Sequence, residues 1–197
     1  MSSIDQQVEE FIAKKKPGTI LFTEEFDHLG NAGAVNVAVH RAEKKKLIKR
    51  LTRGIYAKPK ESHLVGEVLP SVEEVAMAIA KRDKARILPT GSYAMNRLGL
   101  STQVPMKVVY LTDGSPRKIS IGNRTIQFKL TTPKLLSMKG EISKLVVQAL
   151  KEIGNGKATE EEKKRIIDLL KKEDRQLLKH DISLAPRWIG EIMAQAL

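Results

Sequence analysis

The spacing of apolar residues between positions 31 and 60 changes from a helical period to an alternating one. The first half of this stretch repeats apolar residues every three or four positions, as a helix with one buried face does. These residues are Val35, Ala38, Val39 and Ala42. From Leu47 on, the period becomes alternating, which predicts strands at 47–51 and 54–57 with a turn between them. The pattern therefore predicts an amphipathic helix followed directly by a two-stranded β-ribbon.

Residues 1–30 predict a helix, a short strand and a second helix. Ser3 begins a capping box, and the apolar positions after it continue the first helix. After the strand, Thr23 has the residue type of an N-cap for the second helix, which Gly30 ends. Together with the helix and ribbon that follow, this is the element order of a winged helix-turn-helix domain over residues 1–60.

The rest of the chain predicts a linker and a second domain. Residues 61–70 have little periodicity and contain Pro and Gly, which predicts the linker. Residues 71–197 predict a helix, a strand, a helix, an antiparallel meander of three strands and, from Gly140, a wholly helical end. The three strands are predicted at 107–112, 117–121 and 124–130. The last segment, from Ile182, is expected to pack Trp188 on the sheet. The predicted fold class is α+β, with an antiparallel sheet packed against several helices.

The composition limits the chemistry that the chain can carry. The 197 residues include no Cys, which excludes disulfides, zinc fingers and thiol catalysis. The four His residues stand far apart in the sequence, so we expect neither a metal site nor a cofactor. No stretch approaches the ~18 apolar residues of a membrane helix, and the polar, acidic N-terminus is unlike a signal peptide. We therefore expect a cytoplasmic protein.

Positive charge is concentrated in the predicted helix and ribbon. Residues 31–60 hold nine Lys and Arg against one Glu, so they contribute +8 of the formal net charge of +12, whereas residues 1–30 sum to −3. A cationic surface on one structural unit is what phosphate binding requires. The alternative is an ordinary solvated helix end, which explains the lysines at 44–46 but not Lys49 and Arg53 on the ribbon.

The polar side of this helix and the ribbon supply the candidate DNA-binding residues. Such a helix lies in the major groove, where Asn and Arg can pair with base edges while Lys contacts phosphate. The ribbon forms the wing, and the amides at the start of the second helix can bind phosphate. The candidates are Thr23, Asn36, Val37, His40, Arg41, Lys44, Lys45, Lys49, Arg50 and Arg53.

The sequence offers no set of residues typical of a catalytic site. A nuclease-like metal site needs two or three carboxylates that converge on a sheet, and the predicted meander offers only Asp113. Ser92 follows Gly91, but no suitable His and acid accompany it to form a triad. We therefore expect a binding protein and not an enzyme.

Two segments resemble a family of bacterial regulators. Residues 51–56, LTRGIY, follow a small basic helix and resemble the R-L-x-R-G-[IV]-Y signature of the AbiEi-type winged-helix domain. Residues 90–105, TGSYAMNRLGLSTQVP, are similar to the family's G-x-x-A-L-x-x-x-G-L-[ST]-x-Q-x-P segment, with Met95 where Leu is commoner. The resemblance covers about residues 5–150 and is to Bacteroidetes-like members of the family. From Gly140 on, the helical tail matches the better-studied antitoxins poorly.

The resemblance implies an antitoxin of a type IV, abortive-infection toxin–antitoxin system, which is a form of phage defence. Its winged helix would repress transcription by binding double-stranded DNA at repeats in its own promoter. Its second domain would counter a nucleotidyltransferase-like toxin encoded next to it. The tentative partner-binding residues in the second segment and just after it are Leu100, Gln103, Val104 and Met106.

Two other functions fit the same sequence. One is a stand-alone winged-helix transcriptional regulator whose second domain senses a ligand or a partner. The other is a pure protein-interaction module, in which the loop from Leu100 to Met106 is either a contact surface or part of the core. The sequence leaves open the oligomeric state and the DNA sequence that is read.

Overall fold

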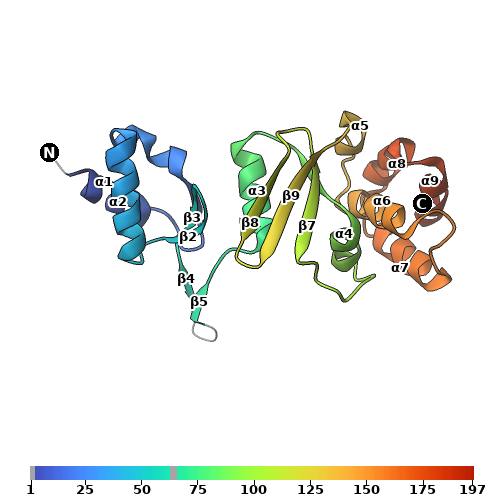
Figure 1. The fold of residues 1–197 in the computed structure, drawn as a ribbon. Coiled ribbons are helices and arrows are strands. Elements are labelled where there is room, and N and C mark those ends of the chain that lie inside the picture. Colours follow the sequence, from blue (N-terminus) through green and yellow to red (C-terminus); the bar gives the residue numbers. More distant parts are fainter. Residues whose placement is uncertain (1–2, 63–65) are drawn as a thin grey trace. The chain divides into compact units, whose positions relative to one another are not determined.

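The computed structural model describes residues 3–62 and 66–197, and the chain divides into two compact units (Figure 1). The N-terminal unit comprises residues 1–78 with 120–122, and the C-terminal unit comprises residues 79–119 with 123–197. The division falls inside helix α3 (Val72–Arg82), not at the predicted linker. Both units combine helices and strands, so the predicted α+β class is confirmed.

The N-terminal unit has the element order that the sequence predicts for residues 1–60. Its elements are α1 (Ile4–Ala13), β1 (Ile20–Phe22), η1 (Thr23–Leu29), α2 (Ala32–Lys44), β2 (Lys49–Thr52) and β3 (Ile55–Ala57). The second helix, η1, is a 3-10 helix. The three strands form one sheet in the order β1-β3-β2, with both pairs antiparallel, so β1 extends the ribbon on its β3 side.

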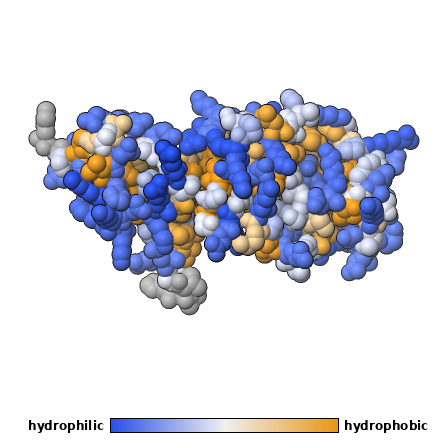
Figure 2. Space-filling model, viewed as in Figure 1, coloured by the Kyte–Doolittle hydropathy of each residue, from blue (hydrophilic) through white to orange (hydrophobic). Residues whose placement is uncertain are grey.

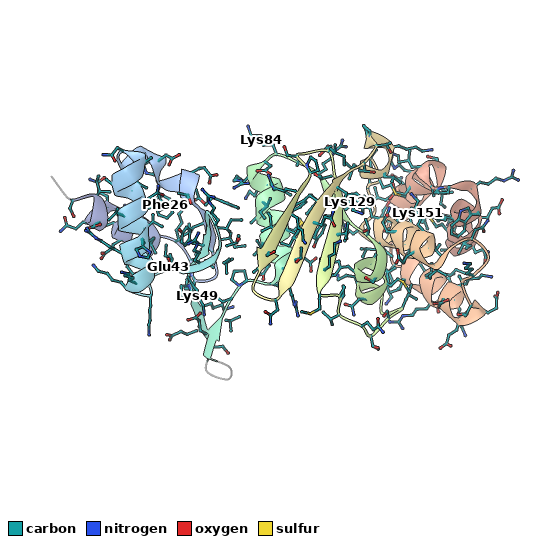
Figure 3. All side chains as sticks on the ribbon, viewed as in Figure 1. Phe26, Glu43, Lys49, Lys84, Lys129 and Lys151 are labelled. Carbon is teal, nitrogen blue, oxygen red and sulfur yellow. The ribbon has the colours of Figure 1, made fainter. Side chains whose placement is uncertain are left out.

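The apolar side of α2 packs into the core of this unit. Its four apolar positions are at most 2% exposed, as the helical period predicts, and they are Val35, Ala38, Val39 and Ala42. Phe26 of η1, labelled in Figure 3, is fully buried in the same cluster, and the edge of the Phe11 ring packs against it. Full burial of a side chain of this size contributes roughly 1.5–3 kcal/mol. The core therefore fixes which side of α2 faces solvent.

Two local contacts fix the ends of the helices beside the ribbon. The Lys58 ammonium, just after β3, donates to the backbone carbonyls of Ile12, Ala13 and Lys15 at 2.7–3.0 Å, where the C-terminal end of α1 attracts a cation. At the end of α2, Lys46 adopts the left-handed conformation, with φ of 59°, and the next amide returns to the carbonyl of Ala42 at 3.0 Å. This turn directs the chain from α2 into β2.

A second ribbon replaces most of the predicted linker. Strands β4 (Lys60–Ser62) and β5 (Gly66–Val68) pair antiparallel, with Lys60 opposite Val68. Residues 63–65, which complete the predicted linker, lie outside the described residues. The sequence does not reveal this ribbon because each strand is only three residues long and leaves no apolar alternation.

The C-terminal unit contains a four-stranded sheet and a group of helices. After the boundary helix α3, the elements are β6 (Ile87–Pro89), α4 (Gly91–Arg97), β7 (Lys107–Thr112), β8 (Arg117–Ile121), β9 (Arg124–Leu130), α5 (Pro133–Leu136), α6 (Glu141–Ile153), α7 (Glu160–Leu170), α8 (Arg175–Leu184), α9 (Arg187–Met193) and η2 (Ala194–Ala196). In the C-terminal part of the chain, all elements after β9 are helices, as the sequence predicts from Gly140.

The order of the sheet differs from the predicted antiparallel meander. The strands lie in the order β6-β7-β9-β8, and β9 pairs with β7 in parallel, with Lys107 opposite Thr125. The chain does not form a hairpin after β7, and Asp113 there accepts two hydrogen bonds of 2.8 Å from Arg86, the residue before β6. Strand β8 forms at the edge, and the Gly122–Asn123 turn places β9 between β7 and β8.

The helices of this unit share a core of their own. Helices α4, α6, α7, α8 and α9 all contribute to one buried cluster, which includes Leu98, Leu150, Ile166 and Ile189. Trp188 packs against this cluster, so the prediction that it packs on the sheet was wrong. The reason is that α9 packs against α6, α7 and α8, whose apolar side chains form this cluster.

Candidate nucleic-acid interface

The outer side of α2 carries the side chains that the sequence assigns to base recognition. Asn31 caps the helix by accepting a hydrogen bond of 2.9 Å from the Ala34 amide. The residues opposite the buried side are all exposed, and they are Asn36, Val37, His40, Arg41 and Lys44. Val37 is the apolar member of this group, with half of its surface exposed. The helix therefore presents one mostly polar surface, as a recognition helix requires.

Two of the candidate cations on α2 are bonded to carboxylates of α1. Arg41 Nη1 lies 2.6 Å from Asp5 Oδ2, and Lys45 Nζ lies 2.6 Å from Glu9 Oε1. Asp5 and Glu9 are one helical turn apart on α1, and Arg41 and Lys45 are one turn apart at the end of α2. The two ion pairs therefore lie one above the other between these helices. All four side chains remain at least one-third exposed, so each pair is screened by water and contributes little stability. A phosphate must compete with these carboxylates.

The ribbon carries one cation that is paired with a carboxylate and others that are not. Lys49, labelled in Figure 3, lies 2.7 Å from Glu67 of β5, whereas Arg50 Nε donates only to the Thr52 carbonyl, at 3.4 Å. Within residues 3–62 and 66–197, no carboxylate forms an ion pair with Lys44, Arg50 or Arg53. These three residues therefore carry the uncompensated charge of the candidate interface.

Tyr56 connects the end of α2 with the ribbon, and the sequence analysis did not assign it to the site. It stands opposite Arg50 in the register of β2 and β3. Burial raises the pKa of its hydroxyl, Arg50 opposes this shift, and Glu43 of α2 adds to it. The hydroxyl therefore stays protonated well beyond neutral pH. The only signal for this residue in the sequence was its place at the end of the LTRGIY segment.

Thr23 does not have the role that the sequence predicts. It is the first residue of η1 and not its N-cap, and its amide donates to the Gly54 carbonyl at 3.1 Å. The amide before it, on Phe22, donates to Glu25 Oε1 at 3.1 Å. Because both amides already have acceptors, this helix start does not offer them to phosphate. Thr23 instead supports the turn of the ribbon.

The tentative partner-binding loop of the C-terminal unit is only partly exposed. Leu100 packs against the helical core, so it is not available as a surface contact. Val104 and Met106 each expose 59% of their surface, and Gln103 is exposed beside them. The loop therefore presents two large apolar side chains to solvent and keeps its first residue inside.

Two carboxylates near the sheet, Asp83 after α3 and Asp113 after β7, are engaged by arginines. Hydrogen bonds from the Arg86 side chain and amide hold the pKa of Asp113 below its ordinary value. Burial raises the pKa of Asp83, but hydrogen bonds from Arg82 and Arg117 outweigh it and lower that pKa overall. In the described part of the chain, no three His, Asp or Glu side chains are grouped as metal ligands would be, and no helix is long and apolar enough to cross a membrane.

Comparison with known proteins gives a family and one distant structure. No curated protein matches the chain. The crystal structure of the Rv2827c protein from Mycobacterium tuberculosis is similar to this chain, with 12% sequence identity and a TM-score of 0.48. The match covers 98% of this chain and 82% of the Rv2827c chain. The profile of a family of unknown function, DUF6088, matches residues 7–178, which is most of the chain. The protein therefore belongs to the DUF6088 family.

Proposed function

We propose that the protein is a sequence-specific, double-stranded-DNA-binding transcriptional repressor whose N-terminal unit is a winged helix-turn-helix. The observation that carries this proposal is the exposed polar side of α2 next to a ribbon with unpaired Arg50 and Arg53. The core holds that side of α2 toward solvent, and β1 joins the ribbon to the same sheet. Figure 2 shows mostly hydrophilic residues on the visible surface, as an interface with a polyanion requires.

In this proposal α2 enters the major groove and the β2–β3 ribbon lies along the backbone. Asn36 can pair with adenine and His40 can donate to a base or phosphate, while Lys44, Arg50 and Arg53 bind phosphates. Arg41 and Lys45 are paired with Asp5 and Glu9 of α1, so they reach DNA only by exchanging one anion for another. The unpaired cations therefore supply most of the affinity, and the exposed residues near the start of α2 supply the specificity.

Val37 gives this proposal a sharp test because an exposed apolar side chain in the major groove can contact the methyl group of thymine. A duplex selected by the protein from a random pool should contain thymines whose replacement by deoxyuridine weakens binding. One buried methyl group contributes about 0.8 kcal/mol, which is roughly a fourfold change in Kd. The Val37→Ala variant should bind both duplexes with nearly the same affinity.

The matched control is Val68→Ala, which truncates an exposed valine of the second ribbon. This variant should remain as sensitive to deoxyuridine as the unmodified protein. If no duplex is enriched by the selection, the proposed repressor function is wrong. If a duplex is enriched but deoxyuridine has no effect at any thymine, α2 reads its site without Val37.

A second candidate function, the antitoxin, is favoured by the exposure of Val104 and Met106 in the loop that the family resemblance covers. Two exposed apolar side chains in one loop suit a protein contact. Growth arrest by a nucleotidyltransferase-like protein encoded beside the gene should be relieved by co-expression of the full chain, and Val104→Asp with Met106→Asp should abolish the relief. If the double variant still relieves growth arrest, the loop is not the surface that binds the toxin. If the full chain gives no relief, the antitoxin function is wrong and the protein is a stand-alone regulator.

A further inference from the structure

A strong unassigned positive charge lies in the segment that contains the sheet of the C-terminal unit. Residues 84–140 contain ten Lys and Arg but a single acidic residue, Asp113, so their formal net charge is +9. The following residues, 141–197, contain eleven Lys and Arg and ten Asp and Glu, for a net charge of +1. Asp113 is itself bonded to Arg86. Five of the ten cations lie on the strands of the sheet, and they are Lys107, Arg117, Lys118, Arg124 and Lys129. Of these, Arg117 is paired with Asp83.

Alternation along the strands places three lysines of this segment on one side of the sheet. Val108 and Tyr110 of β7 and Phe128 of β9 are nearly fully buried, so they face the core. The residues next to these along each strand face the opposite side of the sheet. The register places those of β7 beside those of β9. On β8, Arg117 lies over the Phe128 ring, so its neighbour faces away. The exposed lysines on the opposite side are Lys107, Lys118 and Lys129.

Protection of sheet edges does not explain this arrangement. Lysines on edge strands prevent pairing with other chains, which accounts for Lys118 on β8. Lys107 and Lys129 belong to β7 and β9, which are the two inner strands and lie side by side in Figure 1. Inner strands need no such protection, because both of their edges are already paired. The charges on β7 and β9 therefore favour a binding role.

We propose that this side of the sheet is a second binding surface, for the phosphate backbone of duplex DNA. Lys107 stands opposite Thr125, four residues before Lys129, so the two lysines are separated by about 13 Å along the strands. This spacing is close to the ~12 Å width of the major groove, so the two side chains reach phosphates on its opposite edges. The hydroxyl of Thr125 is an additional donor on the same side.

The aromatic residues argue for duplex and against single-stranded nucleic acid. Proteins that bind single strands stack bases on exposed aromatic rings. In the described part of the C-terminal unit, Tyr110 and Phe128 lie in the core, and Tyr93 and Trp188 are half-buried. This sheet therefore offers cations without a stacking surface, which suits contacts to the backbone that are independent of sequence.

The test compares two triple variants of the full chain on a random-sequence duplex. Each phosphate contact adds about 0.9 to the slope of log K against log salt concentration, so Lys107→Gln, Lys118→Gln and Lys129→Gln together should lower that slope by roughly 2.7. The control removes the same charge from exposed lysines of the helical part, with Lys164→Gln, Lys172→Gln and Lys179→Gln. The control should change the slope little, and both variants should show the melting temperature of the unmodified protein.

The outcomes separate this proposal from the proposed repressor function. Equal slopes for the two triple variants would overturn the proposal that this side of the sheet binds DNA. Displacement of the duplex by a single strand of equal length would also overturn it. The sheet surface stands, and the repressor function fails, if the slope falls as expected while the protein selects no preferred sequence. A reduced slope with the preferred sequence unchanged supports both.

Discussion

Replacement of Asp181 by alanine is expected to lower the free energy of unfolding of the C-terminal unit by about 3–5 kcal/mol. Its side chain is fully buried, and it accepts hydrogen bonds from the amides of Lys139 and Gly140 at 2.7–3.1 Å. These amides stand at the start of α6, the central helix of the unit. Alanine removes the acceptor of both amides and the carboxylate that lies 2.8 Å from His180 Nδ1, and it leaves the buried Gly140 amide without a partner.

The measurement is chemical denaturation followed by circular dichroism. Asp168→Ala is the matched control, because Asp168 is an exposed carboxylate on α7 whose loss should change stability by less than about 0.5 kcal/mol. Glu173, which accepts from the Ile142 and Ser143 amides at 2.8 Å, supplies the rest of the cap and should keep α6 formed in the variant. An equal effect of the two alanine substitutions would show that Asp181 does not hold this helix.

The second large effect is expected for DNA binding. Combined replacement of Lys44, Arg50 and Arg53 by alanine should weaken binding to the selected duplex roughly 100-fold. We take about 1 kcal/mol for each exposed phosphate contact, and these cations have no carboxylate that already compensates their charge. The salt slope should also fall by roughly 2.7, because three phosphate contacts are lost. Fluorescence anisotropy at several salt concentrations measures both quantities.

The matched comparison removes three cations that are paired in the structure. Arg41, Lys45 and Lys49 each lie within 2.7 Å of a carboxylate, so their replacement also frees Asp5, Glu9 and Glu67. We expect the loss of affinity to be below about 10-fold and smaller than for the unpaired set. The reason is that each paired cation must exchange its carboxylate for a phosphate when the unmodified protein binds DNA. A larger loss of affinity for the paired set would mean that these side chains separate from their carboxylates when the protein binds DNA. They would then make the main phosphate contacts.

Local patterns in the sequence were sufficient to predict the capping box at Ser3 and the buried side of α2, but not the start of η1, where Thr23 is the first residue and not the N-cap. The capping box at Ser3 has both of its hydrogen bonds, at 2.9 and 3.2 Å. Each involves residues three positions apart, so propensity and spacing decide them without the rest of the fold. The same holds for Val35 and Ala38, whose burial follows from the helical period.

Contacts between distant parts of the sequence could not be predicted in this way. The pairing of Arg41 with Asp5 joins residues 36 positions apart, and that of Asp181 with Gly140 joins residues 41 apart. The insertion of β9 between β7 and β8 likewise pairs strands that are not consecutive in the sequence, which no local period reveals. For the candidate site, the sequence therefore indicated which residues are cationic but not which of them are compensated.

Protection of DNA upstream of the gene, measured by footprinting, tests the central claim most directly. The full chain should protect a discrete segment of its own upstream region, and protection should survive an excess of random-sequence duplex because the exposed side of α2 reads bases. The Lys44, Arg50 and Arg53 triple alanine variant should lose this protection at the same concentration while it remains folded. Uniform protection along the whole region, or a variant footprint identical to that of the unmodified protein, would contradict the assignment of the interface to α2 and the β2–β3 ribbon.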